Sequence, residues 1–76
     1  MSESNGEPAE IGTRLRTQRA ALRLTQAQVA ERSGIAALTV HRIEAGKGTP
    51  HRATLEVIAR ALGCPVDFLT GDTQHT

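Results

Sequence analysis

Apolar residues recur along the first third of the chain at helical rather than strand spacing. Ile11, Leu15 and Leu22 fall on one side of a helix that has about 3.6 residues per turn. The positions between them are largely polar, and several hold arginine. This one-sided stripe predicts a first helix over residues 11–22, with its arginines facing solvent.

A second helix is indicated by its start and stop signals. Thr25 stands where an N-cap is needed, and Gln28 follows three positions later, which is the spacing of a capping box. Gly34 can adopt the left-handed conformation that ends a helix without a Cβ penalty. These signals predict a helix over residues 26–32.

Three further helices follow the same spacing. After a short turn, Val40 and Ile43 predict a helix over residues 36–45. A fourth helix, which Gly63 ends, is indicated by the apolar positions Leu55, Ile58, Ala59 and Leu62. Pro65 opens a short fifth helix that ends before Gly71. No stretch reads as a strand, so the predicted fold class is all-α, with five short helices.

Charge is distributed unevenly along the 76 residues, although the formal net charge is only +1. Residues 1–10 hold three glutamates and no base, and residues 71–76 hold one aspartate. Residues 11–70 therefore contain all nine basic residues and four acidic ones, a net charge of +5. A basic domain suits a polyanionic partner such as nucleic acid. Because both ends lack apolar periodicity, we expect them to be disordered tails around one folded domain.

Composition excludes several classes of protein. The lone Cys64 rules out an internal disulfide, and no Cys/His pair has zinc spacing, so neither a metal nor a cofactor is expected. No nucleophile stands near a candidate base, which argues against an enzyme. No apolar run reaches the roughly 18 residues of a membrane helix, and no signal peptide is recognisable. We therefore expect a soluble cytoplasmic protein without a membrane partner.

The segment between Thr25 and Gly46, TQAQVAERSGIAALTVHRIEAG, joins two predicted helices through a glycine turn. Small or apolar residues surround that turn at Val29, Ala30, Ile35, Val40 and Ile43. The segment resembles the helix-turn-helix of the Xre family, which contains Cro and the lambdoid phage repressors. The likeness extends through LEVIARALGCPVDFLTG and covers about residues 11–71. The resemblance implies a five-helix fold like that of lambda repressor. It also implies that this protein binds double-stranded DNA as a homodimer, with its third helix in the major groove.

The resemblance and the helical periodicity together nominate base-contacting residues on the helix over 36–45. They are Ala37, Leu38, Thr39, His41 and Arg42. Family members often carry polar residues, frequently Gln, at the positions of Ala37 and Leu38, and often Asn at Ala45. Because all three are apolar here, Arg42 and His41 are left as the main hydrogen-bonding groups. Ala37 and Leu38 offer only contacts to thymine methyl groups, and an outward Leu38 is also compatible with a contact to a protein partner.

Helix ends and the same resemblance suggest the remaining roles. Phosphate contacts are expected from Gln26, Lys47, His51 and Arg52, which lie at or near the starts of the second and fourth helices. Arg19 and Glu44 match a pair that forms a salt bridge between the first and third helices of the phage repressors. The resemblance therefore implies a structural ion pair here.

Small size favours a partner subunit. A folded segment of about 60 residues buries only ~60% of its chain surface, and one helix contacts too few base pairs for specificity. We therefore expect a homodimer, with its interface on the fifth helix at Val66, Phe68 and Leu69.

The expected function is transcriptional regulation, in the first instance repression, by a homodimer on a pseudo-palindromic operator. Half-sites would lie about 10–10.5 bp apart, which is one turn of DNA. RNA or single-strand binding would favour aromatic stacking surfaces, and the chain has one aromatic residue, Phe68. Two alternatives remain open: an antitoxin that neutralises a toxin partner while repressing its own operon, and a restriction-modification controller protein. A toxin-binding extension would require added sequence beyond the short tails, which favours a plain regulator.

Overall fold

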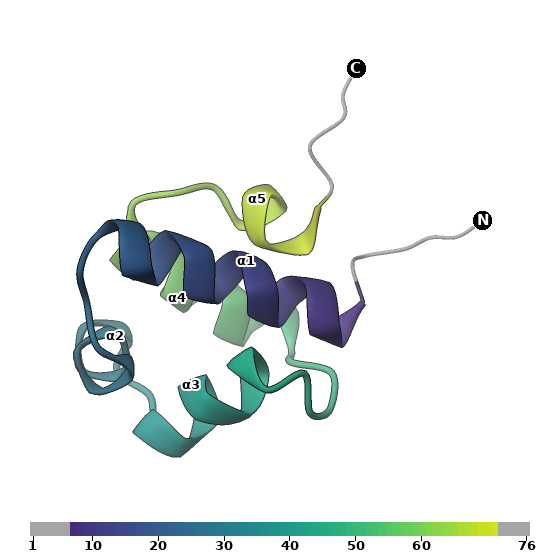
Figure 1. Cartoon of the computed structure of the whole chain (residues 1–76), viewed down its shortest axis with the longest axis horizontal. Helices are drawn as coiled ribbons and strands as arrows, with labels where there is room; N and C mark the ends of the chain where they lie inside the picture. Colours follow the sequence, from purple (N-terminus) through teal and green to yellow (C-terminus); the bar gives the residue numbers. More distant parts are fainter. Residues whose placement is uncertain (1–6, 72–76) are drawn as a thin grey trace.

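The computed structural model describes residues 7–71, which form five helices and no strand. The helices are α1 (Pro8–Ala21), α2 (Gln26–Ser33), α3 (Ala37–Glu44), α4 (Arg52–Leu62) and α5 (Val66–Thr70) (Figure 1). The all-α fold class and the order of five helices are confirmed. Residues 1–6 and 72–76 lie outside the described residues, as does most of each predicted tail.

The first helix begins earlier than predicted. α1 starts at Pro8 rather than Ile11, so residues 8–10 belong to the folded domain and not to a disordered tail. Proline is favourable in a first helical turn, because the N–H that it lacks would have no partner there. The turn that follows α3 lies against this extension, since a Cβ on Gly46 would be 3.3 Å from Ala9 Cα.

The capping signals around α2 are confirmed in detail. Thr25 Oγ1 accepts a hydrogen bond from the Gln28 N–H at 3.0 Å, and Gln28 Oε1 accepts one from the Thr25 N–H at 2.8 Å. Gly34 has a φ of 75° and ends the helix in the left-handed conformation. Two orphan donors are thus satisfied at one end, and at the other the chain turns directly toward α3.

One hydrophobic core holds the helices together. Its buried residues are Ile11, Leu15, Leu24, Val29, Ala30, Val40, Ile43, Leu55, Ile58, Ala59, Leu62 and Leu69. The predicted stripe of α1 is wrong at its last position, because Leu22 follows the helix and is 43% exposed. Leu24 takes its place in the core, since the chain has turned by then toward α2.

A glycine sets the distance between α1 and α3. A Cβ on Gly12 would overlap the carbonyl oxygen of Ile43 and lie 2.8 Å from that of Glu44. Both atoms belong to the backbone, which cannot move aside as a side chain can. The close approach of α1 therefore fixes the position of the C-terminal turn of α3.

The Gly12→Ala variant is expected to lower the free energy of unfolding by about 1–3 kcal/mol, because the added methyl group pushes α1 away from α3. Urea denaturation measures the change. Thr17→Ala, on the exposed side of the same helix, is the matched control and should leave stability nearly unchanged. Equal midpoints for the two variants would contradict the close approach.

Candidate nucleic-acid interface

α3 has one buried side and one exposed side. Val40 and Ile43 are buried in the core, whereas Leu38 is 62% exposed. The other predicted base-contacting residues, Ala37, His41 and Arg42, are also exposed, and Thr39 is half-buried at the edge. The predicted base-contacting residues thus form the exposed side of α3 and its margin.

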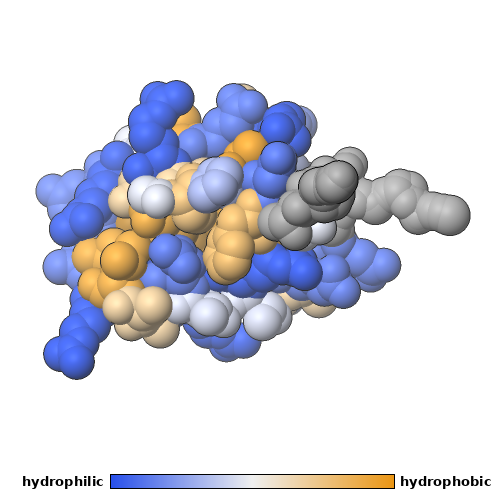
Figure 2. Space-filling view, turned by 90° about the horizontal axis from the view of Figure 1, so that it is seen from above, coloured by the Kyte–Doolittle hydropathy of each residue, from blue (hydrophilic) through white to orange (hydrophobic). Residues whose placement is uncertain are grey.

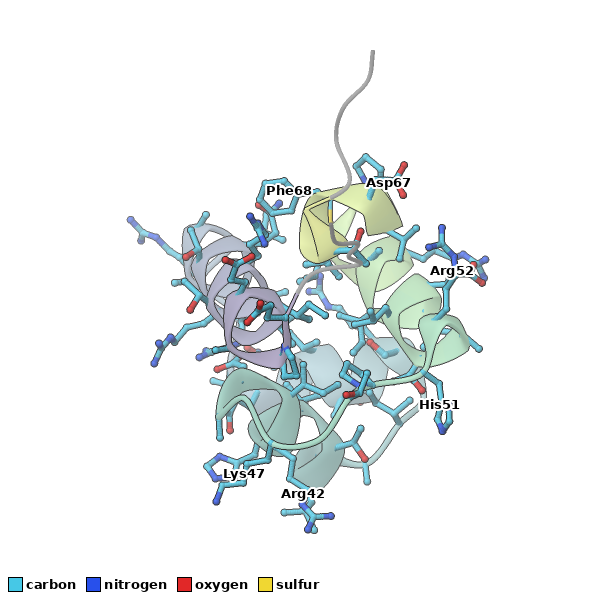
Figure 3. All side chains as sticks on the ribbon, turned by 90° about the vertical axis from the view of Figure 1, so that its right-hand side faces the viewer. Arg42, Lys47, His51, Arg52, Asp67 and Phe68 are labelled. Atoms are coloured by element: carbon cyan, nitrogen blue, oxygen red, sulfur yellow. The ribbon has the colours of Figure 1, made fainter. Side chains whose placement is uncertain are left out.

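A hollow of about 210 Å³ runs beside this exposed side. It is lined by Thr39, Arg42, Ile43, Lys47, Gly48, Thr49, Pro50, His51 and Thr54. Figure 3 shows Arg42 and Lys47 projecting from the same edge of the molecule, with His51 farther along that edge. The fold therefore brings basic groups from α3, the loop after it and the start of α4 to one groove.

The start of α4 adds backbone donors to this groove. His51 is the N-cap residue, and its side chain makes no capping hydrogen bond. The first N–H groups of a helix have no partner within the helix, and its dipole favours an anion there. The N-terminus of α4, which shares the groove with Lys47, is therefore suited to bind a phosphate group.

Arg52 is directed elsewhere. Its Nε lies 3.3 Å from Glu56 Oε2, and its Nη2 lies 3.6 Å from Asp67 Oδ1. Figure 3 shows Arg52 on the side of Asp67, away from Arg42 and Lys47. The structure therefore does not bring this predicted phosphate contact to the groove. The i,i+4 spacing of Arg52 and Glu56 signals their pairing in the sequence, but nothing local signals the approach of Asp67.

The ion pair that the resemblance implied forms between α1 and α3. Arg19 donates from Nε to Glu44 Oε2 at 2.5 Å and from Nη2 to Glu44 Oε1 at 2.9 Å. A third donor, Arg19 Nη1, reaches the carbonyl oxygen of Leu24 at 2.8 Å. The Glu44 side chain is 4% exposed and that of Arg19 is 18% exposed, so the pair is largely shielded from water.

Gln26 joins this pair instead of standing free. Its Nε2 donates to Glu44 Oε1 at 3.0 Å. This bond uses one of the two Nε2 hydrogens, so the second hydrogen is left for the predicted phosphate contact of Gln26. The sequence carries no local signal for this bond, because 18 residues separate the two groups.

Electrostatics keep Glu44 ionised although it is buried. Burial alone would raise the pKa of Glu44, but hydrogen bonds from Arg19 and Gln26 and the nearby arginine charges outweigh it and lower that pKa. The hydrogen bond to Glu44 in turn raises the pKa of Arg19. The negative charge of Glu44, at the end of α3, is thus paired inside the domain with the positive charge of Arg19.

A helix-turn-helix domain family model matches residues 10–69. The chain belongs to the helix-turn-helix family. The expected resemblance to Xre-type and lambda-repressor-like domains is thereby confirmed, and phage repressors are among the relatives.

Two relatives and one solved structure show the range of this helix-turn-helix family. The uncharacterized HTH-type transcriptional regulator RghRB of Bacillus subtilis is 42% identical over 66 residues, which are 86% of this chain and 48% of that protein. The cryptic phage CTXphi transcriptional repressor RstR of Vibrio cholerae is 40% identical over 62 residues, 82% of this chain and 55% of that one. The chain spans about half the length of both curated relatives.

Among solved structures, the restriction-modification controller protein C.AhdI of Aeromonas hydrophila superposes with a TM-score of 0.79 at 29% identity. The match covers 82% of this chain and 94% of that one.

The predicted dimer surface on α5 needs one correction. Leu69 is 0% exposed and fills the core of its own domain, because it faces inward from so short a helix. Val66 and Phe68 pack against the core but remain half-exposed. Figure 2 looks onto α5 and α1 and shows hydrophobic surface between hydrophilic residues. Any contact between two copies here must therefore use Phe68 and Val66 without Leu69.

Within residues 7–71, no group of three or more His, Cys, Asp or Glu residues is placed to hold a metal ion. None of the five helices is long and apolar enough to cross a bilayer. Burial raises the pKa of the Cys64 thiol, which favours the protonated, less nucleophilic form.

Proposed function

We propose that the chain binds double-stranded DNA sequence-specifically and regulates transcription. The observation that carries this proposal is the exposed side of α3, where Arg42 borders a groove flanked by Lys47 and His51. The major groove of DNA admits an α-helix, so the exposed side of α3 can contact base edges there. An arginine can donate two hydrogen bonds to one guanine. Relatives of similar sequence are named transcriptional regulators and repressors, which supports regulation as the outcome of binding. The proposal needs no catalytic step, and it places the protein on DNA in the cytoplasm.

The binding form in this proposal is a homodimer. The eight residues of α3 span about 12 Å, so one copy contacts few base pairs. α5 lies away from α3 in Figure 1, so a contact through α5 leaves α3 free for DNA. A two-fold dimer then presents two α3 helices to half-sites about 10–10.5 bp apart.

A selection for bound sequences from random duplex DNA tests the proposal. We expect a pseudo-palindrome with a guanine in each half-site. Recovery of unrelated sequences would contradict specific binding, and recovery of single asymmetric sites would contradict the dimer.

A controller protein of a restriction-modification system is a second candidate function. Its support is the match to C.AhdI, which covers nearly the whole of that chain. A controller would activate a promoter that it binds. A reporter assay on the selected site therefore separates this candidate from a repressor, because the sign of the effect differs.

Lys47→Ala is expected to weaken binding to all DNA sequences about equally, since Lys47 is proposed to contact a phosphate. The slope of log affinity against log salt should fall by roughly one for each phosphate that is no longer neutralised. Fluorescence anisotropy over a range of salt concentrations measures both quantities. Lys47→Arg keeps the charge and should keep the slope. An unchanged slope in Lys47→Ala would show that this lysine does not neutralise a phosphate.

Phe68→Glu is expected to convert the dimer to a monomer, because it places a charge in an apolar contact. Sedimentation velocity at tens of micromolar measures the change, and circular dichroism checks that the domain is folded. Leu38→Glu makes the same kind of change on α3 and should leave the dimer intact. A parent protein that is monomeric both free and on DNA would refute the dimer.

A further inference from the structure

An apolar side chain stands next to the arginine on the exposed side of α3. Leu38 is 62% exposed, more than Leu22, the other large apolar residue that is exposed within residues 7–71. Leu38 and Arg42 are four residues apart in one helix, so they lie on the same side with Cβ atoms about 5–6 Å apart. The helical turn before Arg42 therefore presents a hydrocarbon surface to whatever α3 contacts.

In the major groove, the edges of the bases offer one apolar group, the C5 methyl of thymine. The remaining groups are hydrogen-bond donors and acceptors, which a leucine cannot satisfy. In helix-turn-helix domains the N-terminal residues of the recognition helix contact base edges, and Leu38 is the second residue of α3. A pyrimidine methyl group is thus the one base substituent that Leu38 can bind favourably.

We propose that Leu38 makes this domain selective for pyrimidine 5-methyl groups, on thymine and on 5-methylcytosine alike, next to a guanine bound by Arg42. This inference rests on the proposed DNA binding. Methylated cytosine carries its methyl on the same ring carbon as thymine, and at the major-groove edge the two bases differ only at position 4. Leucine has no group that senses position 4, so both methyl groups make the same contact.

The spacing within α3 limits where the methyl group lies. One helical turn rises 5.4 Å, and successive base pairs are 3.4 Å apart. Leu38 therefore contacts a pyrimidine about one or two base pairs from the guanine that Arg42 binds. The target class is a duplex in which a methylated pyrimidine stands close to a guanine in each half-site.

Two matched comparisons isolate the methyl group in the selected duplex. Each thymine is replaced in turn by uracil at symmetric positions, which removes only the methyl group. At the responsive position, cytosine is then compared with 5-methylcytosine, which adds only the methyl group. Burial of one methyl group is worth about 0.8 kcal/mol, so we expect roughly a fourfold change in affinity per half-site and about 15-fold for both.

Leu38→Ala is expected to bring both ratios, thymine to uracil and 5-methylcytosine to cytosine, close to one. The substitution lies on an exposed surface, so the helix content should not change, which circular dichroism checks. Lys47→Ala is the control: it should weaken every duplex by a common factor and preserve both ratios.

Each outcome decides the inference. Ratios that persist in Leu38→Ala overturn it, and so does a selected duplex with no thymine that responds to uracil. An unchanged affinity of Leu38→Ala for every duplex also overturns it. A selection that recovers no preferred duplex refutes the proposed function itself, whereas a preferred duplex that is insensitive to methyl groups refutes only this inference.

Discussion

Replacing Arg19 with alanine is expected to lower the free energy of unfolding by about 3–5 kcal/mol. Glu44 would remain buried and ionised with only the Gln26 amide as a partner, and the Leu24 carbonyl would lose its donor. A buried charge without its counter-ion is among the most costly defects in a small domain. Thermal and urea denaturation of the purified variant measure the loss.

A double variant separates the charge effect from the effect of reduced packing. Arg19→Met with Glu44→Leu removes both charges and should recover much of the stability, because apolar replacement of a buried ion pair is often neutral.

The free energy of unfolding of the Arg19→Ala variant should also fall less than that of the parent as the pH is lowered. The lowered pKa of Glu44 in the folded state means that the parent gains stability from this ion pair above the ordinary pKa of a glutamate and loses it as the pH falls through the folded value. An Arg19→Ala protein that melts like the parent would show that the ion pair adds nothing.

Arg42→Ala should cost about 1–3 kcal/mol in binding to the selected site and much less in binding to random DNA. The reason is the pair of hydrogen bonds from one guanidinium to one guanine, which random sequences rarely offer. Competition between cognate and random duplexes in anisotropy measurements gives both affinities. The fold should stay intact, because the Arg42 side chain is exposed and points away from the core.

Arg42→Lys is the matched control for charge. It keeps the positive charge but not the planar fork, so it should retain the salt dependence and lose the preference for guanine. If Arg42→Ala instead lowers cognate and random binding in parallel, as expected for Lys47→Ala, Arg42 contacts phosphate. Specificity would then depend on His41, Thr39 and the apolar side chains.

Local signals in the sequence predicted the fold well. The capping box of Thr25 and Gln28 and the glycine at 34 act within a few residues, so their geometry follows from the sequence itself. The start of α1 was missed because residues 8–10 carry no apolar stripe, and their place depends on the turn at Gly46. Leu22 was misplaced because periodicity cannot show where a helix has already ended.

The site was predictable only as far as helical periodicity reaches. The outward direction of Leu38 and Arg42 follows from the inward direction of Val40 and Ile43. The contacts of Gln26 with Glu44 and of Arg52 with Asp67 join residues that are distant in the chain, and no spacing rule predicts them.

Entry of α3 into the major groove is tested most directly by methylation interference on the selected duplex. Dimethyl sulfate methylates guanine at N7, in the major groove, and adenine at N3, in the minor groove. We expect methylated guanine N7 to prevent binding at one position in each half-site, with the two positions about one helical turn apart, and this interference to disappear in Arg42→Ala. Interference confined to adenine N3, or guanine interference that persists in Arg42→Ala, would contradict the proposed binding of α3 in the major groove.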